Sequence, residues 1–491
     1  MFWQNPNVLI YSHASPESGT TRVNRCMLLA SSLRKLGFQS HFTTNALPSR
    51  LCKKIQSDAY PLEILPDNHS LFRQGHLSKR IDELQPSWLV FDWPETAAKF
   101  PFAEHRICSL SFKDDLAIAI SSSSSHGHTI GSDELLSGPE FVVVPTTSQR
   151  LIKTKTTRAI LNLSDDITLL DVLQLVFAAK IPNLTTDLLM DRPNDSARRT
   201  LQKLDSTEMD IRIHRHGDRL GSLIELTDFA IVDSYAGFLK FAAAGIPCLI
   251  VANSSNRKML GTLTKDNCIQ PIQLSDGNEH NSKQIKRFAG NINLRRELSA
   301  NSAKLVDGHG AERIARAMMA AMFRIRSCEM SDAERLLDWR NDPEIRVVSF
   351  EDKPIPMESH QAWLRKKLQS PFTEVYIVEN DDRKPVGQFR LEFDNQYQSV
   401  RLHLSLVPSL RGMGLGTAFI ERAARLVQQR FPGIEVFAQI KSVNHISQAA
   451  FGKAGFAPIA TTTINGQVAL RFVKTGKLFD VNQNNQKSKA A

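Results

Sequence analysis

The sequence is short of cysteine and has no long apolar run, and these two shortages exclude several classes of protein. Its six cysteines form no C-x-x-C pair and do not cluster with histidine, which argues against a zinc site or a disulfide framework and fits a reducing compartment. The longest apolar run, residues 241–252, is interrupted by Gly245 and Pro247 and stays below the roughly 20 residues that a membrane helix needs. We therefore expect no metal, no disulfide and no membrane partner.

Aromatic residues are scarce as well, at 7% of the chain, and this affects how the net charge of +10 is interpreted. A nucleic-acid-binding protein usually gathers Lys and Arg on one face or interleaves them with aromatic side chains. Here the basic residues are spread along the chain. We favour a basic enzyme that attracts anionic small substrates such as CoA and nucleotide diphosphates, and we expect no nucleic-acid partner.

The first residues also lack the pattern of a secretory signal, because no basic stretch precedes an apolar one. Together with the scattered cysteines, this predicts a cytoplasmic protein.

The 491 residues are too many for one core and indicate three packed units, at roughly 100–200 residues per domain. Residues 1–322 alternate short apolar strands with amphipathic helices, which predicts βα units and mostly parallel sheets. A break near residues 145–157 divides them into units at 1–150 and 151–322. The elements that we expect there include strands at 88–91, 141–144 and 229–232 and a helical segment at 294–322.

The order of elements changes at residue 323. Residues 323–475 predict one mixed α/β domain, with strands at 385–393 and 400–406 and a helix at 417–429. Residues 476–491 are polar, and we expect them to form a disordered tail.

A glycine-rich loop at residues 411–416 (RGMGLG) joins the second of these strands to the helix. Its glycines remove side chains where the backbone must approach a ligand closely, and the helix N-terminus offers unpaired N–H groups to a pyrophosphate. Arg411 can add charge-assisted hydrogen bonds. A tight turn that binds nothing is one alternative. A Rossmann dinucleotide loop fits less well, because no acidic residue ends the next strand at residues 439–441.

A second segment follows at a fixed distance from this loop. Twenty-eight residues after Gly416 the sequence reads NHIS at 444–447 and then FGKAGF at 451–456. Asn444 can cap the helix, and Gly455 can end it in the left-handed conformation. Together the two segments resemble the GNAT acetyltransferase superfamily, whose pattern is R/Q-x-x-G-x-G/A followed by N-x-x-S/A-x-x-x-Y/F-x-K-x-G-F.

This resemblance covers residues 323–475 and implies acetyl-CoA as the co-substrate. It also implies that two neighbouring central strands splay apart and hold the pantetheine arm between them. Leu406 and Val407 would contact the pantetheine, and Asn444 would contact the cofactor near its middle. The residues implied to bind the pyrophosphate are Arg411, Gly412, Met413, Gly414, Leu415, Gly416 and Thr417.

The catalytic groups do not follow from the resemblance. Many family members have a tyrosine where this chain has Phe451, and a phenyl ring cannot protonate the leaving thiolate. The family's frequent catalytic carboxylate would fall at residues 400–402, where no acidic residue stands. Glu392, Asp394 and His403 are the nearest titratable candidates. A structural role for His403 and a water-mediated base both stay open.

Three further segments resemble one branch of the superfamily: LDWRNDPEIR at 337–346, SHQAWL at 359–364 and GQFR at 387–390. Members of that branch acetylate the 4-amino group of a nucleotide-linked amino sugar in nonulosonic-acid biosynthesis. A broader set that acetylates ribosomal-protein N-termini shares the W-R-N pattern. The residues implied to bind the acceptor are Trp339, Arg340, Asn341, His360, Trp363 and Arg390. The alternatives are core packing for the two tryptophans and capping or surface roles for Arg340 and Asn341.

Residues 1–322 resemble, more faintly, the GT-B-type nucleotide-sugar hydrolases of the same pathway. In the family pattern G-x-G-H-x-x-R-C-x-x-L-A, Gly19, Arg25 and Cys26 match, but Arg22 stands where the hydrolytic histidine should be. Because arginine stays protonated, it cannot act as a general base.

The segment at residues 233–247 resembles the nucleotide-binding part of the second GT-B subdomain, with Lys240 in place of a glutamate. Asn256 matches an N-Q pair in which Arg257 replaces the glutamine, and Asp92 and Asp114 match other motifs. The basic residues Arg22, Arg25 and Lys240 can bind a diphosphate. We therefore expect this half to keep the fold, to lack hydrolytic activity and to retain the option of binding a sugar nucleotide.

Together the resemblances imply an α/β protein with an N-terminal GT-B-like pair of Rossmann-type parallel-sheet subdomains and a C-terminal GNAT mixed α/β domain. The leading hypothesis is a cytoplasmic N-acetyltransferase acting on a nucleotide-linked amino sugar. One alternative is a bifunctional hydrolase and acetyltransferase. Another is a protein N-terminal acetyltransferase with an N-terminal binding or scaffold module.

Overall fold

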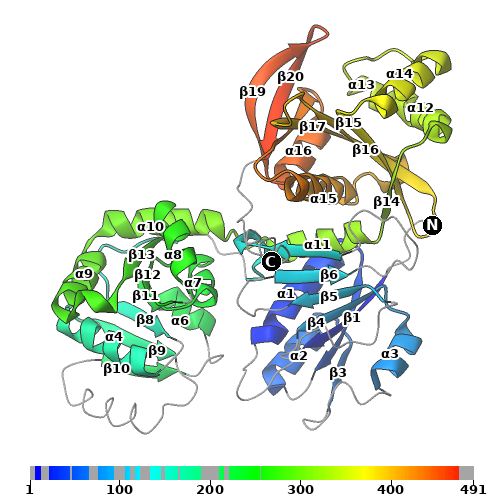
Figure 1. Ribbon diagram of the computed structural model, residues 1–491. Coiled ribbons are helices and arrows are strands. Elements are labelled where there is room, and N and C mark those ends of the chain that lie inside the picture. Colours follow the sequence, from blue (N-terminus) through cyan, green and yellow to red (C-terminus); the bar gives the residue numbers. More distant parts are fainter. Residues whose placement is uncertain are drawn as a thin grey trace, which may run out of the picture.

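The computed structural model describes residues 6–12, 21–44, 47–65, 76–92, 105–110, 117–121, 133–144, 150–163, 166–189, 210–214, 220–254 and 256–474. These residues build three sheets, each with its own helices (Figure 1). Gly19, Asp114 and the expected tail at 476–491 lie outside the described residues.

The first sheet has the strand order β3-β2-β1-β4-β5-β6-β7. Its first five strands are parallel, as predicted, and β6 and β7 extend it antiparallel. The strands are β1 (Asn7–Ser12), β2 (Gln39–Thr44), β3 (Leu62–Ile64), β4 (Trp88–Asp92), β5 (Ile107–Leu110), β6 (Ala117–Ser121) and β7 (Asp133–Ser137). The helices are α1 (Thr21–Lys35), α2 (Ser49–Ser57), α3 (His76–Leu84) and the 3₁₀ turn η2 (Pro139–Phe141).

The second sheet is parallel throughout, in the order β10-β9-β8-β11-β12-β13. Its strands are β8 (Arg158–Asn162), β9 (Thr185–Leu189), β10 (Asp210–His214), β11 (Phe229–Val232), β12 (Cys248–Val251) and β13 (Ile269–Ile272). The helical elements are α4 (Asp166–Ala178), α6 (Leu220–Leu226), α7 (Tyr235–Ala242), α8 (Arg257–Lys265), η3 (Leu274–Asp276), α9 (Asn278–Gly290) and α10 (Ile292–Leu305). The next helix, α11 (Gly310–Ala321), packs in the first unit.

Two of the expected elements are wrong. Residues 141–144 do not form a strand, because the 3₁₀ turn η2 begins at Pro139 and the chain then continues without strand pairing. The helical segment at 294–322 is divided into α10 and α11 by a break around Gly308, which has a φ of 76°. A left-handed residue cannot continue a right-handed helix, so α11 starts in a new direction.

The third sheet is mixed, in the order β14-β15-β16-β17-β18-β20-β19. Its strands are β14 (Arg324–Ser327), β15 (Thr373–Glu379), β16 (Pro385–Phe393), β17 (Ser399–Leu406), β18 (Glu435–Lys441), β19 (Phe456–Ile464) and β20 (Gln467–Lys474). Its helical elements are η4 (Met330–Asp332), α12 (Ala333–Asn341), α13 (Pro343–Val347), α14 (Met357–Gln369), η5 (Pro408–Leu410), α15 (Leu415–Arg430) and α16 (His445–Lys453).

Alternation along the strands of this third sheet gives it two different faces. On one face Phe389, Leu391 and Leu402 belong to the large core that includes α15. On the other face Val375 and Ile377 of β15 pack with Leu364 of α14 and with α12. Because side chains alternate across a strand, the residues between the core positions of β16 and β17 face the α14 side.

Helix α11 connects the first sheet to the third. It lies between α1 of the first unit and α15 of the third, and the apolar side chains of all three helices belong to one continuous core (Figure 1). Arg316 of α11 pairs with Glu421 of α15 through two hydrogen bonds of 3.0 and 2.7 Å. The third domain is therefore packed onto the first unit through this helix.

Arg422 of α15 also contributes to the contact between α11 and α15. Its side chain is 4% exposed, and one guanidinium nitrogen donates to the carbonyls of Ala320 (2.7 Å) and Phe323 (2.9 Å), where α11 ends. Both carbonyls lie in the turn at the end of α11, and the buried guanidinium is a charged donor to each of them.

Within the described residues, no helix has the length and apolar character that crossing a bilayer requires.

We expect Arg422→Met to destabilise the α11–α15 contact by about 2–4 kcal/mol, because buried carbonyls lose a charged donor. Arg430→Met on the same helix is the control. Arg430 pairs with Glu374 but is 47% exposed, so its loss should cost about 1 kcal/mol or less. Hydrogen exchange of the α15 amides measures both values, and equal effects of the two variants would contradict the prediction.

Candidate functional site

The two central strands of the third sheet separate along their length. β17 and β18 pair in parallel only at Ser399–Glu435, Val400–Val436 and Arg401–Phe437. Beyond Arg401, β17 continues to Leu406 without a partner on that side, although both strands are fully described. This is the splay that the resemblance implied, and it leaves backbone groups of β17 free to pair with a ligand.

The glycine-rich loop lies at the open end of this splay. β17 ends at Leu406, η5 turns the chain, and α15 begins at Leu415 with Gly414 as its N-cap residue. Gly412 and Gly414 have φ values of 79° and 80°, in the left-handed region that favours glycine. No side chain of the described residues caps the helix, so its first N–H groups are available to an anion.

Gly412 and Gly414 have different surroundings. A Cβ at Gly412 would meet no heavy atom of the described residues within 4 Å, so this side of the loop is open to a ligand. A Cβ at Gly414 would lie 3.3 Å from Leu36 and 4.0 Å from Met319. Gly414 therefore allows the loop to pack against the first unit, a role that the sequence did not indicate.

The other residues implied to bind the cofactor surround this loop. Leu406, Leu415 and Thr417 are buried, whereas Val407 and Met413 are half-buried against the core. Asn444 caps α16 by accepting from the N–H of Ser447 at 3.0 Å, as predicted. Phe451 is buried and packs edge-on against Phe456.

Arg411 is held within the protein. It donates to the carbonyl of Leu406 (3.1 Å) and to Glu344 of α13 (2.7 Å), and it lies 3.7 Å from Asp342. A pyrophosphate contact by this side chain would require it to leave Glu344.

A polar cluster occupies the α14 side of the splayed sheet. Arg390 and Glu392 of β16 are opposite His403 and Arg401 of β17, in that order. Glu392 is the centre: its carboxylate lies 2.6 Å from Lys367, 3.1 Å from Arg390, 2.9 Å from Arg401 and 3.1 Å from His403.

These contacts fix the protonation of Glu392. Burial alone would raise its pKa, but the hydrogen bond to His403 and the charges of Arg390 and Lys367 outweigh burial and hold the pKa far below its usual range. Glu392 is thus ionised, and because its oxygens are already paired it is a poor proton acceptor.

His403 is the better acceptor. Burial lowers its pKa to about 4, against the opposing effect of Glu392 and with the help of Arg390, so the imidazole is neutral at neutral pH. An ionised Glu392 only accepts hydrogen bonds, so the proton of His403 lies on Nε2 and Nδ1 keeps a lone pair. About a third of the side chain is accessible.

Asp394 has a different environment from the other two candidates. Its carboxylate accepts hydrogen bonds from the backbone N–H groups of Gln396, Gln398 and Ser399 in the turn between β16 and β17. The hydroxyl of Ser399 donates to it as well, at 2.6 Å, and this bond together with the backbone bonds lowers the pKa of Asp394 to about 2. The carboxylate therefore holds the turn, which is a structural use.

Three of the residues implied to bind the acceptor come together beside this cluster. His360 stacks on Trp363 with ring centroids 5.3 Å apart, and the guanidinium of Arg390 lies 5.1 Å from the centroid of the same indole. Arg340 donates to the carbonyl of Glu351 at 2.6 Å, and its charge lowers the pKa of both His360 and Arg390 after the larger effect of burial.

Asn341 and Trp339 have structural contacts. The amide of Asn341 donates to the carbonyl of Ile355 and accepts from its N–H, both at 2.9 Å, and so pins the segment before α14. Trp339 packs against the small core between α12 and α14.

The sequence analysis did not identify Lys367 and Arg401 as site residues. Charged side chains recur at every second position in β16 and β17, and this spacing is the signal that could have identified Arg401.

In the first unit, the motif residues at the start of α1 contact the end of β4. Arg25 donates to buried Asp92 at 2.8 Å, and Arg22 lies 3.9 Å from the same carboxylate. In the second unit, Asn256 is structural: it donates to the carbonyls of Asp233 (2.9 Å) and Val251 (2.8 Å).

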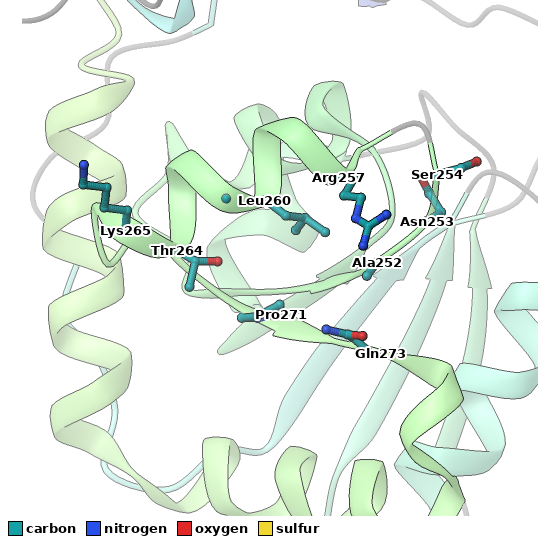
Figure 2. Close-up of a pocket in the computed structure, with 10 residues that line it drawn as sticks. Ala252, Asn253, Ser254, Arg257, Leu260, Thr264, Lys265, Pro271 and Gln273 are labelled. Carbon is teal, nitrogen blue, oxygen red and sulfur yellow. The ribbon is translucent and has the colours of Figure 1, made fainter.

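A pocket of about 670 Å³ lies between α8 and the edge strand β13 of the second unit. Figure 2 shows Arg257 pointing from the start of α8 toward Ala252 at the end of β12, while Lys265 at the other end of α8 points away. The remaining lining residues are Asn253, Ser254, Leu260, Gly261, Thr264, Pro271 and Gln273.

In the described part of the chain, no three side chains of His, Cys, Asp or Glu lie close enough together to hold a metal ion.

Residues 323–457 match the family model of the acetyltransferase (GNAT) domain. This stretch contains the splayed strands, the glycine loop and the polar cluster, so the third domain is a GNAT domain and the chain is an acyltransferase. A search of curated proteins finds no match.

Among solved structures, the chain is similar to spermidine N-acetyltransferase from Vibrio cholerae in complex with CoA and spermine, at 18% identity over 31% of this chain and 95% of that one, with a TM-score of 0.29. It is also similar to AAC(6')-Ib in complex with ribostamycin and coenzyme A, at 19% identity over 33% of this chain and 98% of that one, with a TM-score of 0.29. These values are too low to carry an argument about function.

Gly412→Ala should weaken acetyl-CoA binding about tenfold or more, because a methyl group would enter the open side of the loop. Gly433→Ala is the matched control. Gly433 also has a positive φ (88°) and free space at its Cβ, but it follows the far end of α15, about 24 Å away at 1.5 Å per residue. Calorimetric titration with acetyl-CoA measures both, and an equal loss in the two variants would assign the effect to backbone strain.

The neutral state of His403 can be tested by NMR. We expect its ring signals, identified by their disappearance in His403→Gln, to titrate with a midpoint near 4 rather than near 6.5. In Glu392→Gln the midpoint should fall further, because the carboxylate that favours the imidazolium is gone. A midpoint at 6 or above would place His403 outside the buried cluster.

Proposed function

We propose that the third domain transfers the acetyl group of acetyl-CoA to the amine of a nucleotide-linked amino sugar in nonulosonic-acid biosynthesis. The observation that supports the cofactor is the end of the β17–β18 pairing after Arg401, directly before a loop whose Gly412 is open. Unpaired β17 backbone fits the amides of a pantetheine arm, and the α15 N-terminus fits a pyrophosphate. Acetyl-CoA supplies a reactive thioester when bound.

Residues of the chain can accept the proton that the acceptor amine loses during the reaction. An amine attacks only in its neutral form, and its nitrogen must lose a proton as the amide forms. His403 can accept that proton on Nδ1, directly or through a water, and Glu392 can stabilise the imidazolium through the 3.1 Å contact to Nε2. Buried Phe451 supplies no acid for the thiolate.

The nucleotide-linked acceptor rests on three features. These are the W-R-N segment at 339–341, the net positive charge of the chain and the neighbouring units that resemble nucleotide-sugar enzymes. The cation-rich cluster around Glu392 does not suit a polycation such as a polyamine, and this favours an anionic acceptor.

For residues 1–322 we propose a GT-B-like pair of subdomains that binds a nucleotide sugar without hydrolysing it. The mostly parallel first sheet, the parallel second sheet and the return of α11 from the second unit to the first support the GT-B-like arrangement. Arg22 and Arg25 remain basic beside Asp92, and no histidine replaces the absent hydrolytic residue within the described part of α1.

A panel of amines distinguishes the candidate functions. With acetyl-CoA and the full chain, we expect acetylation of nucleotide-linked amino sugars, and peptides with free N-termini should react at least 100-fold more slowly. The rate should rise with pH through the pKa of the amine and then level off, since Phe451 provides no phenol to ionise. Efficient acetylation of peptides, with every amino-sugar nucleotide ignored, would favour the protein N-terminal acetyltransferase instead.

A further inference from the structure

Positive charge is in excess beside the acceptor side of the sheet. Lys367, Arg390 and Arg401 all pair with the single carboxylate of Glu392. No other carboxylate of the described residues pairs with any of the three. One negative charge cannot balance three positive ones, so two remain uncompensated in side chains that are only 28%, 15% and 35% exposed.

Two neighbouring polar atoms, one on α12 and one on α14, also lack partners among the described residues. Nη1 of Arg340 and Nε2 of His360 are buried and make no hydrogen bond to the described residues. His360 is 4% exposed and stacks on Trp363, whose ring also faces Arg390. Buried polar atoms are usually satisfied, so two unsatisfied ones beside the three cations point to a polar group that completes this side of the sheet.

The place of these cations relative to the reaction follows from the register. Arg401 is the last residue of β17 that pairs with β18, and His403, the proposed proton acceptor, is two residues further along the same face. The basic groups therefore lie at the closed end of the splay, next to the position of the reacting amine. A ligand that spans both must carry an amine and an anionic group in one molecule.

We infer that Lys367, Arg390 and Arg401 bind the phosphate of a phosphate-bearing amine, and so select the acceptor. This inference rests on the proposed function and names the residues that read the acceptor's charge. Guanidinium groups suit phosphate because they donate in a planar fork, and a lysine adds a further charged donor. The phosphate belongs either to the diphosphate of a nucleotide-linked sugar or to a sugar 1-phosphate.

The same charges exclude a polycation. A polyamine bound beside these cations would place its ammonium groups next to two uncompensated positive charges in a partly buried environment, where repulsion is weakly screened. A carboxylate free to receive it would be needed, and Glu392 is already shared among three cations.

Lys367→Met tests the inference, with Lys366→Met as its control. Lys366 is the preceding residue of α14 and is exposed. At saturating acetyl-CoA, the full chain is assayed with four acceptors: a nucleoside-diphosphate amino sugar, an amino-sugar 1-phosphate, the free amino sugar and spermidine. Arg401→Gln serves as a second variant, and the affinity of each variant for acetyl-CoA checks that the domain is folded.

We expect Lys367→Met and Arg401→Gln to raise KM for the phosphate-bearing acceptors about tenfold, with KM for the free amino sugar unchanged and spermidine poor throughout. Lys366→Met should change nothing. A tenfold effect on the diphosphate sugar alone identifies the diphosphate as the source, and an effect on both identifies a single phosphate. Equal KM changes for charged and uncharged acceptors, or none, would overturn the inference while leaving the proposed function intact.

Binding of inorganic pyrophosphate at saturating CoA tests the subsite without turnover. CoA occupies the glycine loop, so calorimetry should show binding that is weakened about tenfold in Lys367→Met and kept in Lys366→Met. If wild-type protein acetylates no amino-sugar nucleotide, the proposed function fails. The pyrophosphate titration then still decides the subsite, and identical isotherms for the two variants would refute it.

Discussion

The parallel pairing of β17 with β18 ends after three residue pairs, and the acetyltransferase domain is organised around that end. A strand that loses its neighbour must satisfy its backbone groups elsewhere, and solvent or a ligand are the choices that remain. Two features of the chain border this gap. The unpaired edge of β17 faces the space between the strands, and the loop that follows places the N-terminus of α15 at the open end of that space. Core packing by α15 on one face keeps both strands in place despite their divergence.

The opposite face of the same sheet is where charge collects. Strand alternation sends Leu391 and Leu402 into the core, and by the same rule it sends Glu392, Arg401 and His403 toward α14. Glu392 is then the shared partner that allows several cations to be half-buried together. It also orients His403 through Nε2. One carboxylate therefore has two consequences: it maintains a basic surface and it fixes the tautomer of the histidine beside it.

The sequence allowed much of the third domain to be predicted, because each of its signals is local. The strand, loop and helix around residues 411–416 can be read from spacing, and so can the capping role of Asn444. The ion pair between Lys367 and Glu392 could not be predicted from the sequence. The two residues are 25 positions apart in the chain, and only the packing of α14 on the sheet brings them together. The contact of Gly414 with Leu36 depends on docking between units, and no local pattern encodes it.

The N-terminal units were predictable in class and less so in detail. Apolar runs with helices between them predicted the parallel strands, whereas the antiparallel strands β6 and β7 carry no comparable signal. Residues 141–144 are apolar, and three of the four are valines, which favours a strand, but the turn at Pro139 and the approach of Gly310 place them against α11. Tertiary packing overrode local propensity at that position.

Only two residues separate the end of α11 at Ala321 from the start of β14 at Arg324, and α11 itself is buried between α1 and α15. A connection this short, anchored on both sides, has none of the reach of a tethered linker. The acetyltransferase cannot swing toward the second unit to collect or deliver a molecule. A small molecule that passes between the acetyltransferase and the second unit must therefore travel by free diffusion. A flexible tether would raise the effective concentration of one domain near the other, and this short connection gives no such gain.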